Sequence, residues 1–176
     1  MADAALDSAS LYRLTEGLGA GELVPLDGDS GFRVPAGCLL DQLGIVLTRI
    51  GRGTAVAEMT LGKGHLNQRG IAQAGAIVAL ADATAGWASY SAIEHGGFTT
   101  LQLSTNLLRA GRAGDRLVAT AKPVRLGRRV QVIDVFVAAV DEHDSDGEGE
   151  LVARFTCNQL VLEPKSDRTS RDATGA

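Results

Sequence analysis

The stretch QAGAIVALADATAGWASYSAI, residues 73–93, decides the fold of this chain. Alanine and leucine have high helix propensity and the stretch contains no proline, so we predict one long helix. Its apolar residues fall on nearly every face, which is typical of a helix buried on all sides. Gly96 and Gly97 follow shortly after and are typical of a helix end. We therefore expect this helix at the centre of the molecule.

Strand-like runs lie on both sides of the predicted helix. Two precede it, at residues 45–50 and 54–61, with a turn at Arg52-Gly53. Four follow it: Phe98–Leu108, Asp115–Leu126, Arg129–Asp141 and Glu150–Leu162. Tight breaks between these four favour an antiparallel meander. The order predicts an α+β fold, in which one curved antiparallel sheet wraps around one long central helix. A second copy of the chain would cover the remaining core and the sheet edges.

The length of 176 residues fits one domain. We expect residues 31–163 to form it, with a short helix within residues 36–45. Residues 1–30 are expected to be a partly ordered leader with a possible helix at residues 10–18. Residues 164–176 contain no apolar residue larger than alanine, apart from proline, and are expected to be a disordered tail.

Composition excludes several classes of protein. The net charge of −4 argues against nucleic acid or an anionic membrane as the main partner. Cys38 and Cys157 lie far apart and show neither metal-ligand spacing nor a disulfide framework, so we expect a cytoplasmic protein without a metal. The N-terminal residues lack the apolar core of a signal peptide. Asp82 interrupts the longest apolar stretch, which argues against a transmembrane span.

Asp82 is the only charged side chain between Gly70 and Ile93. Aspartate is a poor residue for a helix interior, and burying its charge is costly without partners. Positions where such local rules fail are often functional. Asp82 is therefore a candidate catalytic group. The structural alternative is that it caps a second helix or pairs with an arginine on a neighbouring strand, and the residues alone leave both open.

The loop before the helix supplies further candidates. The first N–H groups of a helix have no partner within it and form a partly positive site, suited to a carbonyl oxygen that gains charge. Asn67 and Gln73 flank this entry, and Ala74 and Gly75 are small enough for a substrate to approach their backbone. The structural alternatives are a turn-forming Asn67 and an ordinary helix-start residue at Gln73.

The string GHLNQRGIAQAGAIVALADATAGWAS, residues 64–89, resembles the signature of hotdog-fold thioesterases of the PaaI group, which belongs to phenylacetate degradation. His65 and Asn67 match the family's His-x-Asn, Gly70 matches its intervening glycine, and Asp82 matches its helix acid in a Leu-Ala-Asp setting. The resemblance extends over about residues 36–163.

The chain departs from this family pattern at one place. Where the family has His-Gly-Gly, this chain has Gln73-Ala74-Gly75. Glutamine can form hydrogen bonds but does not titrate near neutral pH. The departure bears on the rate and the substrate class more than on the fold.

The resemblance implies hydrolysis of an acyl-CoA thioester to the free acid and CoA, with CoA part of the substrate and no separate cofactor. By the same resemblance, Asp82 would be the general base or nucleophile, and the Ala74 N–H would polarise the thioester carbonyl. Asn67 would help to hold the thioester or the water, and Thr100 would orient the water. Thr100 is otherwise an ordinary strand residue.

Spacing along the helix bears on assembly. Ala74 and Asp82 are eight residues apart, or about 12 Å along the axis. A general base must reach its proton within about 3 Å, directly or through one water. One chain therefore cannot easily supply both groups, whereas two antiparallel helices from two chains can. We expect a homodimer or homotetramer.

A basic set lies at strand ends and turns. Its members are Arg109, Arg112, Arg125, Arg128 and Arg129. These arginines could contact the phosphates of CoA, or they could be solvated turn residues. A non-catalytic acyl-CoA-binding or regulatory protein of the same fold is the alternative function, favoured by the absence of the family histidine and opposed by Asp82 and Asn67.

Overall fold

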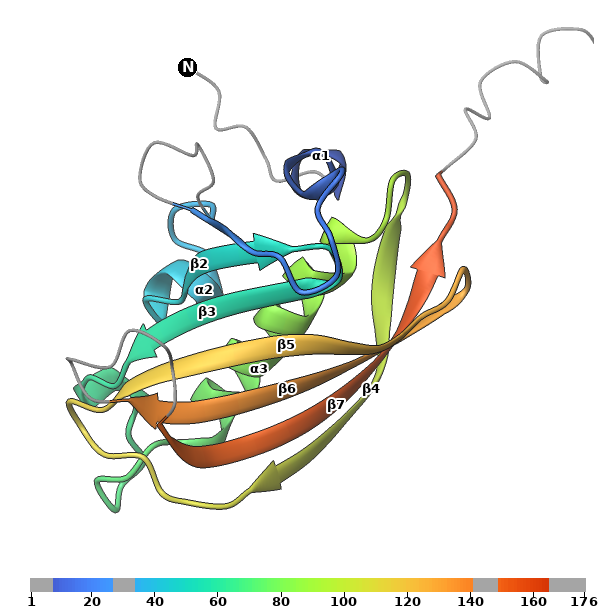
Figure 1. Cartoon of the computed structure of the whole chain (residues 1–176). Coiled ribbons are helices and arrows are strands. Elements are labelled where there is room, and N and C mark those ends of the chain that lie inside the picture. The colour runs from blue at the N-terminus through green and yellow to red at the C-terminus, as the bar shows by residue number, and fades with distance from the viewer. Residues whose placement is uncertain (1–7, 27–33, 141–148, 165–176) are drawn as a thin grey trace, which may run out of the picture.

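A curved, seven-stranded antiparallel sheet wraps around one long helix (Figure 1). The computed structural model describes residues 8–26, 34–140 and 149–164. Its elements are α1 (Ser8–Thr15), β1 (Val24–Pro25), α2 (Leu39–Gln42), β2 (Val46–Gly51), β3 (Thr54–Thr60), the short 3₁₀ turn η1 (Lys63–His65), α3 (Ala74–Ser91), β4 (Gly97–Leu107), β5 (Arg116–Leu126), β6 (Val130–Val140) and β7 (Glu150–Leu162). The predicted α+β hotdog fold is confirmed. The predicted tail lies outside the described residues, except for Pro164.

Strand order differs from the predicted meander at one strand. The order across the sheet is β1-β2-β3-β5-β6-β7-β4. The meander prediction holds for β5, β6 and β7 and is wrong for β4, which pairs with β7 at the far edge. Strand β5 carries three fully buried residues that pack in the core with α3, namely Leu117, Ala119 and Ala121. Their burial requires β5 to lie in the centre of the sheet, beside β3. The link from β4 to β5, residues 108–115, is long enough to cross the end of the sheet.

Helix α3 forms the core of the molecule, but it is not buried on all sides as predicted. Eleven of its residues are buried, and small side chains such as Ala81, Ala85 and Ala88 let it approach the sheet closely. One strip remains open, with Gly75 and Asp82 exposed; the residues between and beside them, Val78, Ala79 and Ala83, are half-buried. Among the described residues, no helix is long and apolar enough to cross a membrane.

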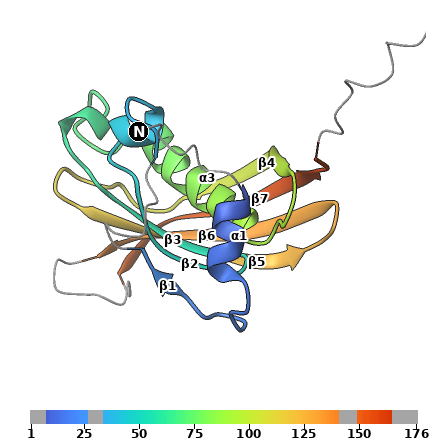
Figure 2. The same ribbon diagram turned by 90° about the horizontal axis from the view of Figure 1, so that it is seen from above.

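The N-terminal segment adds to this core. Figure 2 shows α1 lying against α3. Leu11 of α1 is buried, and the Thr15 hydroxyl donates a hydrogen bond of 3.0 Å to the Ser91 carbonyl at the end of α3. Strand β1 pairs with β2, with Val24 opposite Ile50. The described part of the expected leader thus contributes one helix and one short strand.

Candidate active site

The loop that precedes α3 is fixed by backbone hydrogen bonds. The N–H of Gln73 donates to the His65 carbonyl at 2.7 Å, and the N–H of Ala72 donates to the Gly111 carbonyl at 2.9 Å. Gly111 lies so close to its neighbours that a Cβ there would be 2.7 Å from Leu61 Cδ1. These contacts hold the first turn of α3 against the link between β4 and β5.

His65 and Asn67 shape this loop. The Gly62 N–H, which can only donate, lies 2.9 Å from His65 Nδ1, and the Leu43 carbonyl lies 2.9 Å from Nε2. Nδ1 is therefore the acceptor and Nε2 carries the proton. Asn67 Oδ1 accepts the Arg69 N–H at 2.9 Å, which is the turn contact of the structural alternative. In this chain both side chains support the entry to the helix.

The first turn of α3 is open to a ligand. Gln73 is the N-cap residue; its side chain is exposed and forms no capping hydrogen bond. No described residue other than glycine has a positive φ, so Ala74 does not need a glycine-only conformation. A Cβ added at Gly75 would meet nothing within 4 Å. Replacement of the family's first His-Gly by Gln73-Ala74 therefore preserves the backbone geometry of a helix start.

A cleft of about 280 Å³ lies beside this helix start. Its walls are mainly apolar, and its lining residues are Ile71, Ala72, Ala74, Ile77, Leu107, Leu108, Arg109, Ala110 and Gly111. Arg109 brings a guanidinium to the cleft, and its Nε lies 3.0 Å from a Glu150 carboxylate oxygen. The cleft therefore joins two predicted site residues, Ala74 and Arg109.

Asp82 and Thr100 meet on the open side of α3. The Thr100 hydroxyl on β4 donates to Asp82 Oδ1 at 3.4 Å, a long hydrogen bond, and both residues are exposed. No lysine or arginine in the described parts of the chain forms an ion pair with Asp82. The structural alternative of a buried ion pair therefore lacks a partner there, and the expectation that Asp82 is buried is wrong for the single chain.

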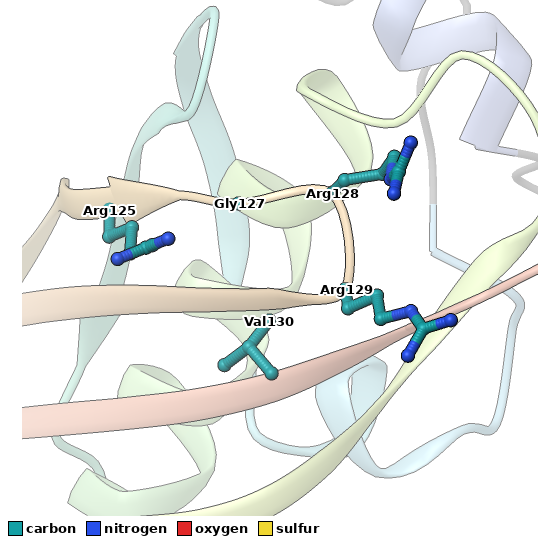
Figure 3. Close-up of a pocket in the computed structure, with 5 residues that line it drawn as sticks. All are labelled: Arg125, Gly127, Arg128, Arg129 and Val130. Atoms are coloured by element: carbon teal, nitrogen blue, oxygen red, sulfur yellow. The ribbon is translucent and has the colours of Figure 1, made fainter.

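Three other predicted basic residues lie at the opposite end of the helix, whereas Arg112 lies with Arg109 on the link between β4 and β5. Figure 3 shows Arg125 on β5 with Arg128 and Arg129 on the turn to β6, around a pocket of about 340 Å³. Leu126 beside them approaches Gly53, whose N–H donates to Ser91 Oγ at the end of α3 at 2.9 Å. These three arginines and Arg109 thus lie near opposite ends of α3 within one chain.

Comparison with known proteins identifies the family. A model of the thioesterase superfamily matches residues 70–145. A solved variant of the phenylacetic acid degradation protein PaaI from Thermus thermophilus is 31% identical, covers 70% of this chain and 97% of its own, and superposes with a TM-score of 0.62. This chain belongs to the thioesterase superfamily. The predicted resemblance to the PaaI group is thereby confirmed.

Two further relatives extend the comparison of this thioesterase-family chain. A Streptococcus mutans protein solved with acetyl-CoA bound is 27% identical over 69% of this chain and 91% of its own, with a TM-score of 0.60. A curated Archaeoglobus fulgidus protein whose name assigns it to the esterases is 34% identical over 92 residues. That match spans 52% of this chain and 58% of the relative's length.

Sequence reasoning missed the buried groups beneath Asp82. Cys157 on β7 is fully buried, and its pKa is raised to about 12 by burial and, to a smaller extent, by the carboxylates of Asp82 and Asp134. Further along β7, Gln159 is also fully buried and accepts a hydrogen bond from the Ser89 hydroxyl of α3. From the sequence alone both are ordinary strand residues, because their burial depends on the register of β7 against the helix.

We expect Cys157 to resist alkylation in the folded protein at about pH 8, whereas half-buried Cys38 reacts, because the thiolate is the nucleophile. The raised pKa also predicts a pH effect on stability. The contribution of this thiol to the free energy of unfolding is fully present below its ordinary pKa of 9.0. Above that pH the unfolded chain loses the thiol proton while the folded chain keeps it, so the contribution is lost as the pH rises toward about 12. Peptide mass mapping after iodoacetamide treatment, with and without urea, checks the first result. Equal labelling of both cysteines in the folded protein would contradict it.

Proposed function

We propose that this protein hydrolyses an acyl-CoA thioester to the free acid and CoA. The observation that carries the proposal is the Asp82 carboxylate, which lies on the open strip of α3 beside the Thr100 hydroxyl and has no cationic partner among the described residues. A carboxylate held in this way is available as a base. Membership of the thioesterase superfamily supports the reaction, and the acetyl-CoA bound to the Streptococcus mutans relative supports the substrate class.

The helix start would bind the reacting carbonyl. The Ala74 N–H lies at the partly positive end of α3, and Ala74 borders the cleft; both features support a role in which this N–H would stabilise the oxyanion that forms during attack. The exposed Gln73 amide adds a hydrogen-bonding group, and Gly75 leaves room for the thioester. Asn67 would act mainly by shaping the loop.

Asp82 would remove a proton from a water that attacks the carbonyl carbon. The C–S bond then breaks, and the proton taken up by Asp82 would pass to the leaving sulfur, so that CoA departs as its thiol and the Asp82 carboxylate is restored. Attack by Asp82 itself, through a mixed anhydride that water then opens, uses the same carboxylate. In either route Thr100 would orient the attacking group through its hydrogen bond to Asp82.

The complete site would need two chains. The open strip of α3 and the exposed edge strand β4 leave a surface for a second copy. Antiparallel packing of two α3 helices would bring Asp82 of one protomer to the Ala74 N–H of the other. It would also place the Arg128–Arg129 turn of one protomer near Arg109 of the other, giving a basic rim for the phosphates of CoA.

Thiol release tests this proposal directly. We expect the purified protein to release free CoA from at least one member of a panel of short, medium-chain and aromatic acyl-CoAs, at a rate well above a no-enzyme control. A thiol-reactive dye reports the product. Tight binding of an acyl-CoA without any thiol release across the panel would contradict hydrolysis and favour a non-catalytic acyl-CoA-binding protein.

A further inference from the structure

A third and larger cavity lies on the face of the sheet that points away from α3. Its volume is about 990 Å³, within the range of small-molecule sites. Side chains alternate between the two faces of a strand, and Ala55 and Ala57 of β3 pack in the core with α3. Val56 between them belongs to a separate apolar cluster and lines the cavity. The sheet therefore separates this outer cavity from the proposed thioester site.

The floor of the outer cavity is one row of side chains across four strands. Arg49 on β2 is opposite Val56 on β3, Val56 is opposite Thr120 on β5, and Thr120 is opposite Phe136 on β6. Lys122 lies two residues beyond Thr120 and so projects from the same face. The floor thus combines the apolar side chains of Val56 and Phe136 with the basic side chains of Arg49 and Lys122.

The wall of the outer cavity comes from the segment between α1 and β1. Leu18, Gly19, Ala20, Gly21 and Leu23 line it. Gly21 has a φ of +83°, a conformation that favours glycine, and folds this segment back over the sheet. The cavity therefore depends on the N-terminal segment as well as on the sheet.

The charged side chains among the described lining residues of the outer cavity are all basic. Arg49, Arg52 and Lys122 line it, and none of its described lining residues is acidic. The acid opposite Lys122 is Asp134, which already accepts hydrogen bonds from Arg154 at 2.9 Å and from Thr156 at 2.6 Å.

Two other carboxylates near the outer cavity are also engaged. Glu22 accepts the Gly19 N–H at 2.8 Å, and Glu58 forms two 2.9 Å hydrogen bonds with Arg116. Among the described residues, no carboxylate lies within ion-pair distance of Arg49, Arg52 or Lys122. Within the described parts of the chain, the cavity therefore presents positive charge without a matching acid.

We propose that the outer cavity binds a small organic anion that carries an apolar body. Its carboxylate or phosphate group would accept charge-assisted hydrogen bonds from Arg49 and Lys122, while its apolar body would lie on Val56 and Phe136. The site is independent of the proposed hydrolysis, because its residues face away from α3.

Calorimetric titration of the full chain tests this site with four probes. Decanoate and decyl phosphate share an apolar body and differ in their anionic group, decanol lacks the charge, and inorganic phosphate lacks the body. We expect at least one of the two amphipathic anions to bind at least about tenfold more tightly than decanol and inorganic phosphate, and their relative affinity identifies the preferred anionic group. Equal binding of decanol, or no binding of either anion, would overturn the proposal.

Two cavity variants and one control variant test where the anion binds. The double variant Arg49→Ala/Lys122→Ala should weaken anion binding at least about tenfold, whereas the control Arg128→Ala/Arg129→Ala should leave it unchanged. Thr120→Trp should fill the cavity and abolish binding, with thiol release from acyl-CoA retained. Unchanged affinity in both cavity variants would place the anion elsewhere. A smaller assembly of Thr120→Trp by light scattering would show that a second copy occupies this face and would also overturn the proposal.

Discussion

Replacing Asp82 by asparagine is expected to lower the rate of thiol release by at least about a hundredfold, because the variant keeps the size of the side chain and removes the base. The free energy of unfolding should stay the same or rise slightly. Asp82 forms no ion pair with a described residue, so the change leaves no partner charge behind. A thiol-release assay and a denaturant titration on one preparation measure both quantities.

Asp134→Asn is the matched control for this experiment. Asp134 lies on the outer face of the sheet and accepts hydrogen bonds from Arg154 and Thr156. Its replacement should lower stability by about 1–3 kcal/mol and leave turnover nearly unchanged. The reverse pattern for Asp82→Asn, with retained hydrolysis and a strongly lowered stability, would show that Asp82 has a structural role only.

Replacing Ala74 by proline should lower turnover by about a hundredfold, since it deletes the one N–H proposed to stabilise the oxyanion. Ala74 is the first residue of α3, where proline is well tolerated. The preceding Gln73 already has the extended backbone, with ψ of 129°, that a following proline requires. The helix should therefore persist, with helical circular dichroism unchanged.

Ala74→Ser is the control for the proline variant. It retains the N–H and adds only a small hydroxyl, so its turnover should stay within a few-fold of the parent protein. Full activity in the proline variant would show that the thioester carbonyl is polarised somewhere other than the Ala74 N–H.

Local pattern predicted the elements of this fold well, because helix propensity and strand alternation are properties of neighbouring residues. It failed for β4, since pairing with β7 depends on contacts between distant segments. It also failed for the open strip of α3. Val78, Ala79 and Ala83 are apolar, and apolar composition alone does not distinguish a surface covered by its own sheet from one that stays open in the single chain.

For the candidate site too, the sequence predicted individual residues but not which of them lie close together. Thr100 and Asp82 are 18 residues apart in sequence, and the structure brings them into contact. Arg109 and Arg128 share a basic character in the sequence, yet they lie near opposite ends of α3. Buried Cys157 carried no signal, because its environment comes from the register of β7 against α3.

Subunit complementation tests the central claim, a site shared by two chains, most directly. Equal amounts of Asp82→Asn and Ala74→Pro, each inactive alone, are unfolded together and refolded. Half of the dimers should then contain one chain of each kind, and each mixed dimer should have one intact site, formed by Ala74 of the first variant and Asp82 of the second. Recovery of about a quarter of the parent activity is the expected result for a two-fold symmetric pair. A refolded mixture as inactive as either variant alone, with mixed dimers demonstrated by mass spectrometry, would contradict the shared site.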